Sequence, residues 1–92
     1  MRVTNKMLEM RVALLNDMTG AAQEPYQPER DADGHLITNI GTYYIGGAYG
    51  GHRLERMTRG GGATDISPRL SKSALADWLN AYINGIEIGM KL

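Results

Sequence analysis

The sequence predicts a small α+β domain: an N-terminal helix, a Gly/Tyr-rich antiparallel sheet of two or three strands, and a C-terminal helix followed by a short tail or strand. Three observations predict it. The 92 residues suffice for one domain, residues 1–92, and not for two. Apolar residues recur at helical spacing near both ends of the chain. β-Branched and aromatic residues, interrupted by glycines, fill the stretch between them.

Residues 4–19 predict the first helix. Thr4 is a suitable N-cap, and Gly20 follows the last helical residue. One face is predicted to carry the apolar side chains Met7, Leu8, Leu14, Leu15 and Met18, and the other Lys6, Glu9, Asn16 and Asp17.

Arg11 falls within the apolar arc of this helix and has two interpretations. It can extend to solvent or pair with an acid at the edge of the core, or it can reach a ligand pocket between helix and sheet. The structural role is favoured.

Residues 21–35 predict a polar connector, an ordered crossing or a mobile loop without a regular element. It contains two prolines and the turn-forming pair Asp33-Gly34. Asp31, Asp33 and His35 resemble part of a calcium loop, but the later ligands and the closing Glu are missing. A polar turn is therefore favoured over a metal site.

Residues 36–67 predict the β-region. Strand-forming residues occupy 36–37, 42–45, 52–58 and 63–66, with turns expected at 46–51 and 59–62. Leu54 should face the helices. Because side chains alternate along a strand, Arg56 then shares its side, and Arg53 lies on the open side beside Glu55.

Residues 71–84 predict the second helix, with Ser71 as N-cap. Its apolar stripe comprises Leu75, Trp78, Leu79, Tyr82, Ile83 and Ile86. Trp78, the largest of these, is expected to anchor the core. Gly85 is expected to end the helix, and the alternating residues 86–92 fit a strand or a frayed tail equally well.

The composition narrows the function classes. Formal net charge is zero, whereas nucleic-acid binders usually carry a positive excess. With no Cys and two His, neither a disulfide nor a metal or other cofactor is expected. A domain of this size buries only a small core. Without a disulfide or a metal to stabilise it, we expect a homo-oligomer. The lack of Cys and of any apolar run near 20 residues fits a cytoplasmic protein without membrane contact.

Residues 41–56 are the most distinctive stretch. Glycine amides that can form an anion-binding nest are interleaved with tyrosine rings and arginine forks. The candidate ligand-binding residues are Tyr43, Tyr44, Tyr49, Arg53, Arg56 and Arg11. They suit an anionic or nucleotide-like ligand, although the stretch matches neither common phosphate-binding motif. The alternative interpretation is a glycine-rich hairpin whose tyrosines only pack.

No catalytic motif stands out, and an enzyme is not expected. His52 with Glu55 or Asp65 nearby in the chain is a possible general base, but a lone His in a hairpin usually has no such role. The α-β-β-β-α order resembles a double-stranded-RNA-binding domain. Lys72 stands alone, however, where that module needs clustered lysines.

Several short segments carry a resemblance to a known group of proteins: residues 7–12 with 15–16, the stretch Gly47-Ala-Tyr-Gly-Gly-His-Arg-Leu, and residues 69–72 with 80–83 and 85–86. They are similar to small uncharacterised accessory proteins of tailed bacteriophages and prophages. The resemblance brings no established activity. It implies action in a bacterial cytoplasm, where such proteins bind host proteins, nucleic acids or signalling nucleotides, including as counter-defence sponges.

The leading hypothesis from the sequence is therefore a non-enzymatic binding protein that sequesters an anionic or nucleotide-like ligand. The alternatives are a protein–protein inhibitor of a host factor and a nucleic-acid-binding module.

Overall fold

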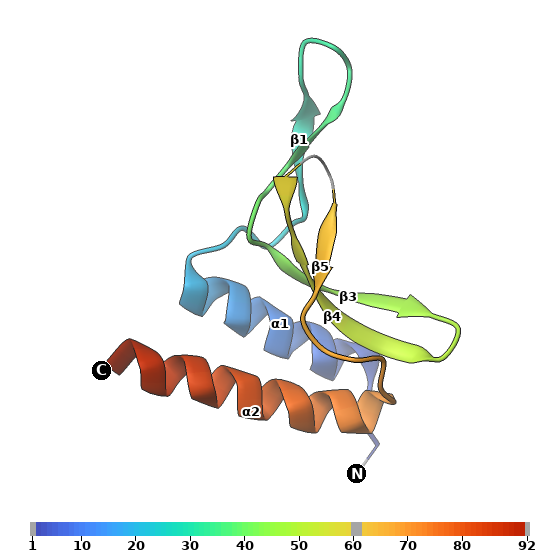
Figure 1. The fold of residues 1–92 in the computed structure, drawn as a ribbon, viewed down its shortest axis with the longest axis vertical. Coiled ribbons are helices and arrows are strands. Elements are labelled where there is room, and N and C mark those ends of the chain that lie inside the picture. Colours follow the sequence, from blue (N-terminus) through green and yellow to red (C-terminus); the bar gives the residue numbers. More distant parts are fainter. Residues whose placement is uncertain (1, 60–61, 92) are drawn as a thin grey trace.

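The computed structural model describes residues 2–59 and 62–91, and it confirms the predicted α+β fold (Figure 1). Its elements are α1 (Asn5–Thr19), β1 (Tyr26–Arg30), β2 (Leu36–Thr38), β3 (Tyr43–Ala48), β4 (Gly51–Met57), β5 (Ala63–Asp65) and α2 (Lys72–Lys91).

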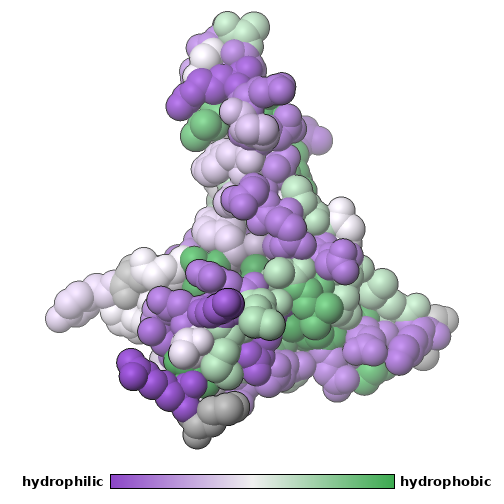
Figure 2. All heavy atoms as spheres, turned by 180° about the vertical axis from the view of Figure 1, so that it is seen from behind, coloured by the Kyte–Doolittle hydropathy of each residue, from purple (hydrophilic) through white to green (hydrophobic). Residues whose placement is uncertain are grey.

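The strands form two antiparallel sheets, a hairpin of β1 and β2 and a three-stranded sheet of order β3-β4-β5. The two helices lie side by side against one face of the larger sheet, and the β1–β2 hairpin projects away from this body (Figure 1). On the face seen in Figure 2, the projecting part is mainly hydrophilic, and more hydrophobic side chains lie on the lower body. The core lies between α1, α2 and the strands β3 and β4.

The first helix begins and ends as predicted. The Thr4 hydroxyl accepts a hydrogen bond from the backbone N–H of Met7 at 3.2 Å, and Gly20 adopts a left-handed φ of 72°. The predicted apolar face is partly wrong. Leu14 is 50% exposed, whereas Asn16, expected on the polar face, is 1% exposed. Because α1 packs against both α2 and β3, its buried face lies closer to Val12 and Asn16 than the face predicted from the sequence.

The prediction of a connector without regular structure is wrong for residues 26–30. These residues form β1, which pairs with β2 in the register Tyr26↔Thr38 and Arg30↔Leu36. The Asp33-Gly34 turn is confirmed, with φ of 80° at Gly34. Every residue of β1 is exposed, so no face needed apolar residues. The alternating pattern that reveals a half-buried strand was therefore missing from the sequence.

The β3–β4 hairpin turns more tightly than predicted. Ala48 pairs with Gly51, so Tyr49 and Gly50 alone form the loop. Gly51 has a φ of 125°, and a Cβ there would lie 2.6 Å from the backbone oxygen of Leu70, so only glycine fits. Leu54 is fully buried under the helices, as predicted. The turn expected at 59–62 includes residues 60 and 61, which lie outside the described residues.

The second helix continues past its predicted end. Residues 86–91 are helical, so the expected strand or frayed tail is wrong for them, while Leu92 lies outside the described residues. Gly85 faces open space and is tolerated there, because Ile86 packs against the core one residue later. Trp78 lies at the margin of the core, where it stacks on Tyr82 with ring centroids 5.0 Å apart, and Leu75 and Leu79 fill the centre.

Candidate functional site

The three tyrosines predicted to bind a ligand lie in three different environments. Tyr43 is buried in the core, and its hydroxyl is 3.1 Å from that of Tyr82. Tyr44 lies on the opposite, open face of the sheet, because neighbouring side chains of a strand alternate. Tyr49 is fully exposed at the tip of the β3–β4 hairpin. No single pocket among the described residues therefore contains all three rings.

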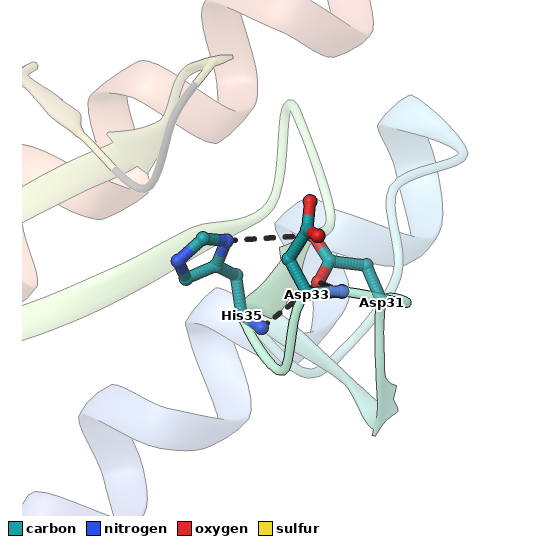
Figure 3. Close-up of side chains that lie close together, drawn as sticks. All are labelled: Asp31, Asp33 and His35. Carbon is teal, nitrogen blue, oxygen red and sulfur yellow. Dashed lines mark hydrogen bonds and ion pairs between the residues drawn. The ribbon is translucent and has the colours of Figure 1, made fainter.

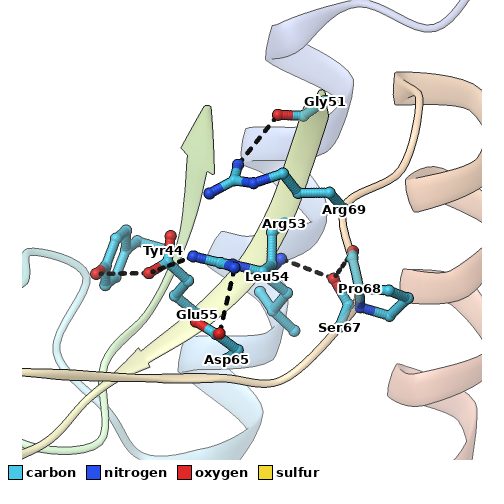
Figure 4. Close-up of polar contacts among 9 residues, drawn as sticks. All are labelled: Tyr44, Gly51, Arg53, Leu54, Glu55, Asp65, Ser67, Pro68 and Arg69. Atoms are coloured by element: carbon cyan, nitrogen blue, oxygen red, sulfur yellow. Dashed lines mark hydrogen bonds and ion pairs between the residues drawn. The ribbon is translucent and has the colours of Figure 1, made fainter. Parts of the chain in front are cut away.

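Arg53 lies on the open face, as predicted, and is held there by acids (Figure 4). Its guanidinium is 3.2 Å from Asp65 and 3.7 Å from Glu55. The Tyr44 hydroxyl donates to the same Glu55 carboxylate at 3.5 Å, and burial and the charge of Glu55 raise the pKa of Tyr44. A Cβ at Gly46 would overlap this carboxylate, so glycine leaves the space that Glu55 occupies.

The remaining two arginines also have intramolecular partners. Arg56 lies over the Tyr43 ring at 4.9 Å and donates to the backbone oxygen of Gly41 at 3.1 Å. Arg11 bridges the two helices, since its Nε donates to the Asn80 side chain at 2.8 Å. The prediction of a structural role for Arg11 fits this bond. Of the two structural forms expected, extension to solvent or pairing with an acid, the second is not what this bond shows, because the partner is an amide. Tyr43 and Arg56 therefore lie together on one face of the sheet. Tyr44 and Arg53 lie on the opposite face, where both contact Glu55.

The turn of the projecting hairpin gathers Asp31, Asp33 and His35 (Figure 3). Their potential ligand atoms lie within 4.8 Å of one another, and all three residues are exposed. One oxygen of Asp31 accepts the backbone N–H groups of both Asp33 and His35 at 2.9 Å. These bonds are those of an Asx-type turn, and they account for the cluster as turn chemistry.

A groove of about 600 Å³ lies between α1 and the free edge of β3. Its lining comes from α1, from the start of the connector and from the β3–β4 hairpin: Asn5, Leu8, Glu9, Val12, Ala13, Asn16, Gln23, Glu24, Pro25, Tyr43, Tyr44, Ile45, Gly47 and His52. Leu8, Val12, Pro25 and Ile45 make part of this wall apolar. Its ionisable groups other than tyrosine are two glutamates and one histidine.

The backbone of β3 presents alternate residues to this groove. In an antiparallel pair, every second residue bonds to the partner strand and the residues between them point their N–H and C=O groups outward. Tyr43 is one of the outward residues, because both its backbone groups bond to the Asn16 side chain, its N–H at 2.7 Å and its C=O at 2.9 Å. Ile45 and Gly47 share this direction, and no hydrogen bond from the described residues reaches their outward groups.

The outer edge of β4 is covered, in contrast. The backbone groups of His52 pair with Leu70 at 2.8 Å. Figure 4 shows the N–H of Leu54 donating to the Ser67 hydroxyl, at 2.9 Å. Arg69 adds a bond to the backbone oxygen of Gly51 at 3.3 Å. The part of the β3 edge that Asn16 does not reach, from Ile45 towards the hairpin tip, is therefore open and faces the groove.

His52 lies at the hairpin end of this groove, on the same face of β4 as Leu54. Glu55 and Asp65, which the sequence suggested as its catalytic neighbours, contact Arg53 on the other face. The structure therefore does not assemble the dyad that a His52 general base would need.

Sequence reasoning missed the groove residues Glu9, Asn16, Ile45 and Gly47. Asn16 gave one usable signal, because it lies one helical turn after Val12 and next to Leu15, at the edge of the buried arc. The open backbone of Ile45 and Gly47 gave none, since the parity of a strand's hydrogen bonds depends on its pairing and not on its residue types.

Comparisons of this chain with protein-family models, with curated proteins and with solved structures found no match. No helix in the described ranges, 2–59 and 62–91, is long and apolar enough to cross a membrane.

Proposed function

We propose that this chain is a non-enzymatic protein-binding module that captures an extended segment of a partner protein as an additional strand on β3. The observation that carries the proposal is the open half of the β3 edge, where Ile45 and Gly47 turn their backbone groups into a groove walled by α1. Unpaired strand edges are templates for pairing with another chain, and proteins usually protect them. Strand addition to such an edge is a recurrent mode of peptide recognition.

The edge defines where the bound segment begins. Asn16 already occupies the backbone groups of Tyr43, so pairing starts at Ile45 and runs towards the hairpin tip. Ile45 and Gly47 together offer two N–H donors and two C=O acceptors. The exposed ring of Tyr49 lies just beyond them, where it can contact a segment longer than the groove.

The proposal that the six tyrosines and arginines form one anion-binding site has less support from the geometry. Arg53 is paired with two acids, Arg56 with a tyrosine ring and a carbonyl, and Arg11 with the second helix. In the part of the chain that the structure describes, no lysine or arginine lines the groove. Binding of a nucleotide or of double-stranded RNA stays a prediction, and a thermal-shift screen with nucleotides and oligonucleotides checks it.

The sequence resemblance sets the biological context of the proposal. It makes a protein of a bacterial host the expected partner and the host cytoplasm the expected place of action. Self-association of the chain also stays a prediction. It is expected because the core is small and has no disulfide to stabilise it. Light scattering at micromolar concentration checks the oligomeric state.

A pair of substitutions at Gly47 tests strand addition. Gly47→Pro removes the outward N–H without removing a bond to β4, and edge strands tolerate proline. Gly47→Ala is the matched control, because its Cβ would meet only the His52 ring at an ordinary 3.8 Å and the N–H is retained. Both variants, and the unchanged protein, are used to select binders from a displayed library of random ten-residue peptides.

The unchanged protein and Gly47→Ala should enrich the same peptides, and Gly47→Pro should lose them while its circular dichroism spectrum is unchanged. Enrichment that Gly47→Pro leaves intact, or no enrichment by any of the three proteins, would contradict strand addition at β3.

A further inference from the structure

We infer that the segment bound along β3 carries lysine or arginine at alternating positions, with these side chains facing α1; this inference rests on the proposed function. Three features of the groove support it: the charge of its lining, the place of its carboxylates on α1 and the connector, and the spacing of side chains on an added strand.

The lining of the groove is acidic. Among the described residues that line it, Glu9 and Glu24 are the carboxylates, none is a lysine or arginine, and His52 lies at the hairpin end. Neither glutamate forms an ion pair with any of the described residues, whereas Glu55 pairs with Arg53 and Glu87 with Lys91. A cationic side chain entering the groove would therefore find two carboxylates that have not yet been paired.

The helix places Glu9 beneath the position of an added strand. At 100° per residue, Glu9 lies 60° further round α1 than Val12, on the side that faces the groove. Ala13 follows Glu9 by one helical turn, about 6 Å along the axis. The Gln23 side chain donates to the backbone oxygen of Ala13 at 3.0 Å, which brings the Gln23-Glu24 pair to this point. The two glutamates thus follow one another along the groove.

This arrangement matches the repeat of a strand. On an added strand, side chains facing α1 occur at every second residue, about 6.6 Å apart. Lysine and arginine suit these positions, because their methylene stems can lie on the exposed Ala13 and the half-buried Pro25 while their charged ends reach the glutamates. A second copy of this chain joined through β3 would instead bring both sets of glutamates to one seam, so the charges favour a different, basic partner.

The peptide selection on the unchanged protein supplies the first readout of this inference. The enriched peptides should carry Lys or Arg at every second position of a common register. A synthetic copy of the most enriched peptide, labelled with a fluorophore, is then compared with a copy in which those residues are Gln. Fluorescence anisotropy at low salt should show the basic peptide binding about 2- to 30-fold more tightly, the range expected for two partly exposed ion pairs.

Charge reversal on the protein supplies the second readout. The double variant Glu9→Lys/Glu24→Lys should lose the preference for the basic peptide and prefer a Glu-substituted copy. The control Asp17→Lys/Asp77→Lys makes the same change of net charge at two exposed positions outside the groove, and it should keep the preference. The preference should also weaken in 0.5 M salt.

The outcomes separate this inference from the proposed function. Peptides that depend on the Gly47 N–H but show no alternating basic residues, or no response to charge reversal, would overturn the inference and leave strand addition standing. Peptides that bind independently of Gly47, or a selection that enriches nothing, would overturn both.

Discussion

Replacing Asn16 with alanine removes the two hydrogen bonds that fasten α1 to the edge of β3. The side chain is 1% exposed, and its bonds to the backbone of Tyr43 measure 2.7 and 2.9 Å. Each buried backbone group left unpaired costs about 1–3 kcal/mol. The higher helix propensity of alanine returns up to about 0.7 kcal/mol, and water entering from the groove can pair with part of the exposed edge. We expect a net loss of about 2–4 kcal/mol.

Urea unfolding followed by circular dichroism measures this loss, which corresponds to a fall in melting temperature of about 10–25 °C for a domain of this size. Asn84→Ala is the matched control, since it removes the same side chain from an exposed position of α2 and should change stability by less than about 0.5 kcal/mol. Asn16→Asp should recover little, because a carboxylate cannot donate to the Tyr43 carbonyl. An Asn16→Ala protein as stable as Asn84→Ala would refute the stabilising role of the two hydrogen bonds between Asn16 and Tyr43.

Three further predictions concern the glycines and Tyr82. Gly85→Ala should raise the free energy of unfolding by about 0.5–1 kcal/mol, because Gly85 is an open position within α2; a loss of stability would indicate that the helix ends there. Gly51→Ala should lower it by at least about 2 kcal/mol in the same urea assay, since φ is 125° and Leu70 blocks the Cβ; an unchanged midpoint would refute that constraint. Burial and the hydrogen bond with Tyr43 raise the pKa of Tyr82 to about 12, above the value near 10 of an unfolded chain. The stability that this pKa shift contributes is complete below pH 10 and is lost as the pH rises towards 12. In Tyr82→Phe the free energy of unfolding should therefore fall less steeply over this pH range. Parallel plots of the free energy of unfolding against pH for the two proteins would contradict the shift.

The sequence predicted the elements whose apolar residues show a clear period. The position and buried face of the second helix and the inward direction of Leu54 were predicted correctly, because both bury apolar side chains against the same core. The hairpin of β1 and β2 was missed because β1 is exposed on every residue and therefore has no alternation to detect. The end of α2 was misplaced at Gly85, since a glycine that ends a helix and one that faces solvent within a helix look alike in a sequence.

The candidate site was harder to predict than the fold. The distinctive tyrosines and arginines of residues 43–56 drew attention through their composition, but the alternation of β4 separates Arg53 from Arg56 onto opposite faces, where each finds a partner within the chain. The groove depends instead on where α1 crosses β3 and on which backbone groups of Ile45 and Gly47 point outward. Such features follow from tertiary packing, for which the residue types along the chain give little signal.

Amide hydrogen exchange at single-residue resolution, with and without an enriched peptide, tests strand addition at β3 most directly. In the free protein the N–H groups of Tyr44 and Gly46 should be protected by β4 and that of Tyr43 by Asn16, while Ile45 and Gly47 should exchange fast. A saturating peptide should slow hydrogen exchange at the N–H groups of Ile45 and Gly47 at least tenfold. At Tyr43, Tyr44 and Gly46 the exchange rates with and without peptide should be nearly equal. Unchanged exchange at Ile45 and Gly47 with the peptide bound, or slow exchange at both in the free protein, would contradict an open edge that pairs with a partner strand.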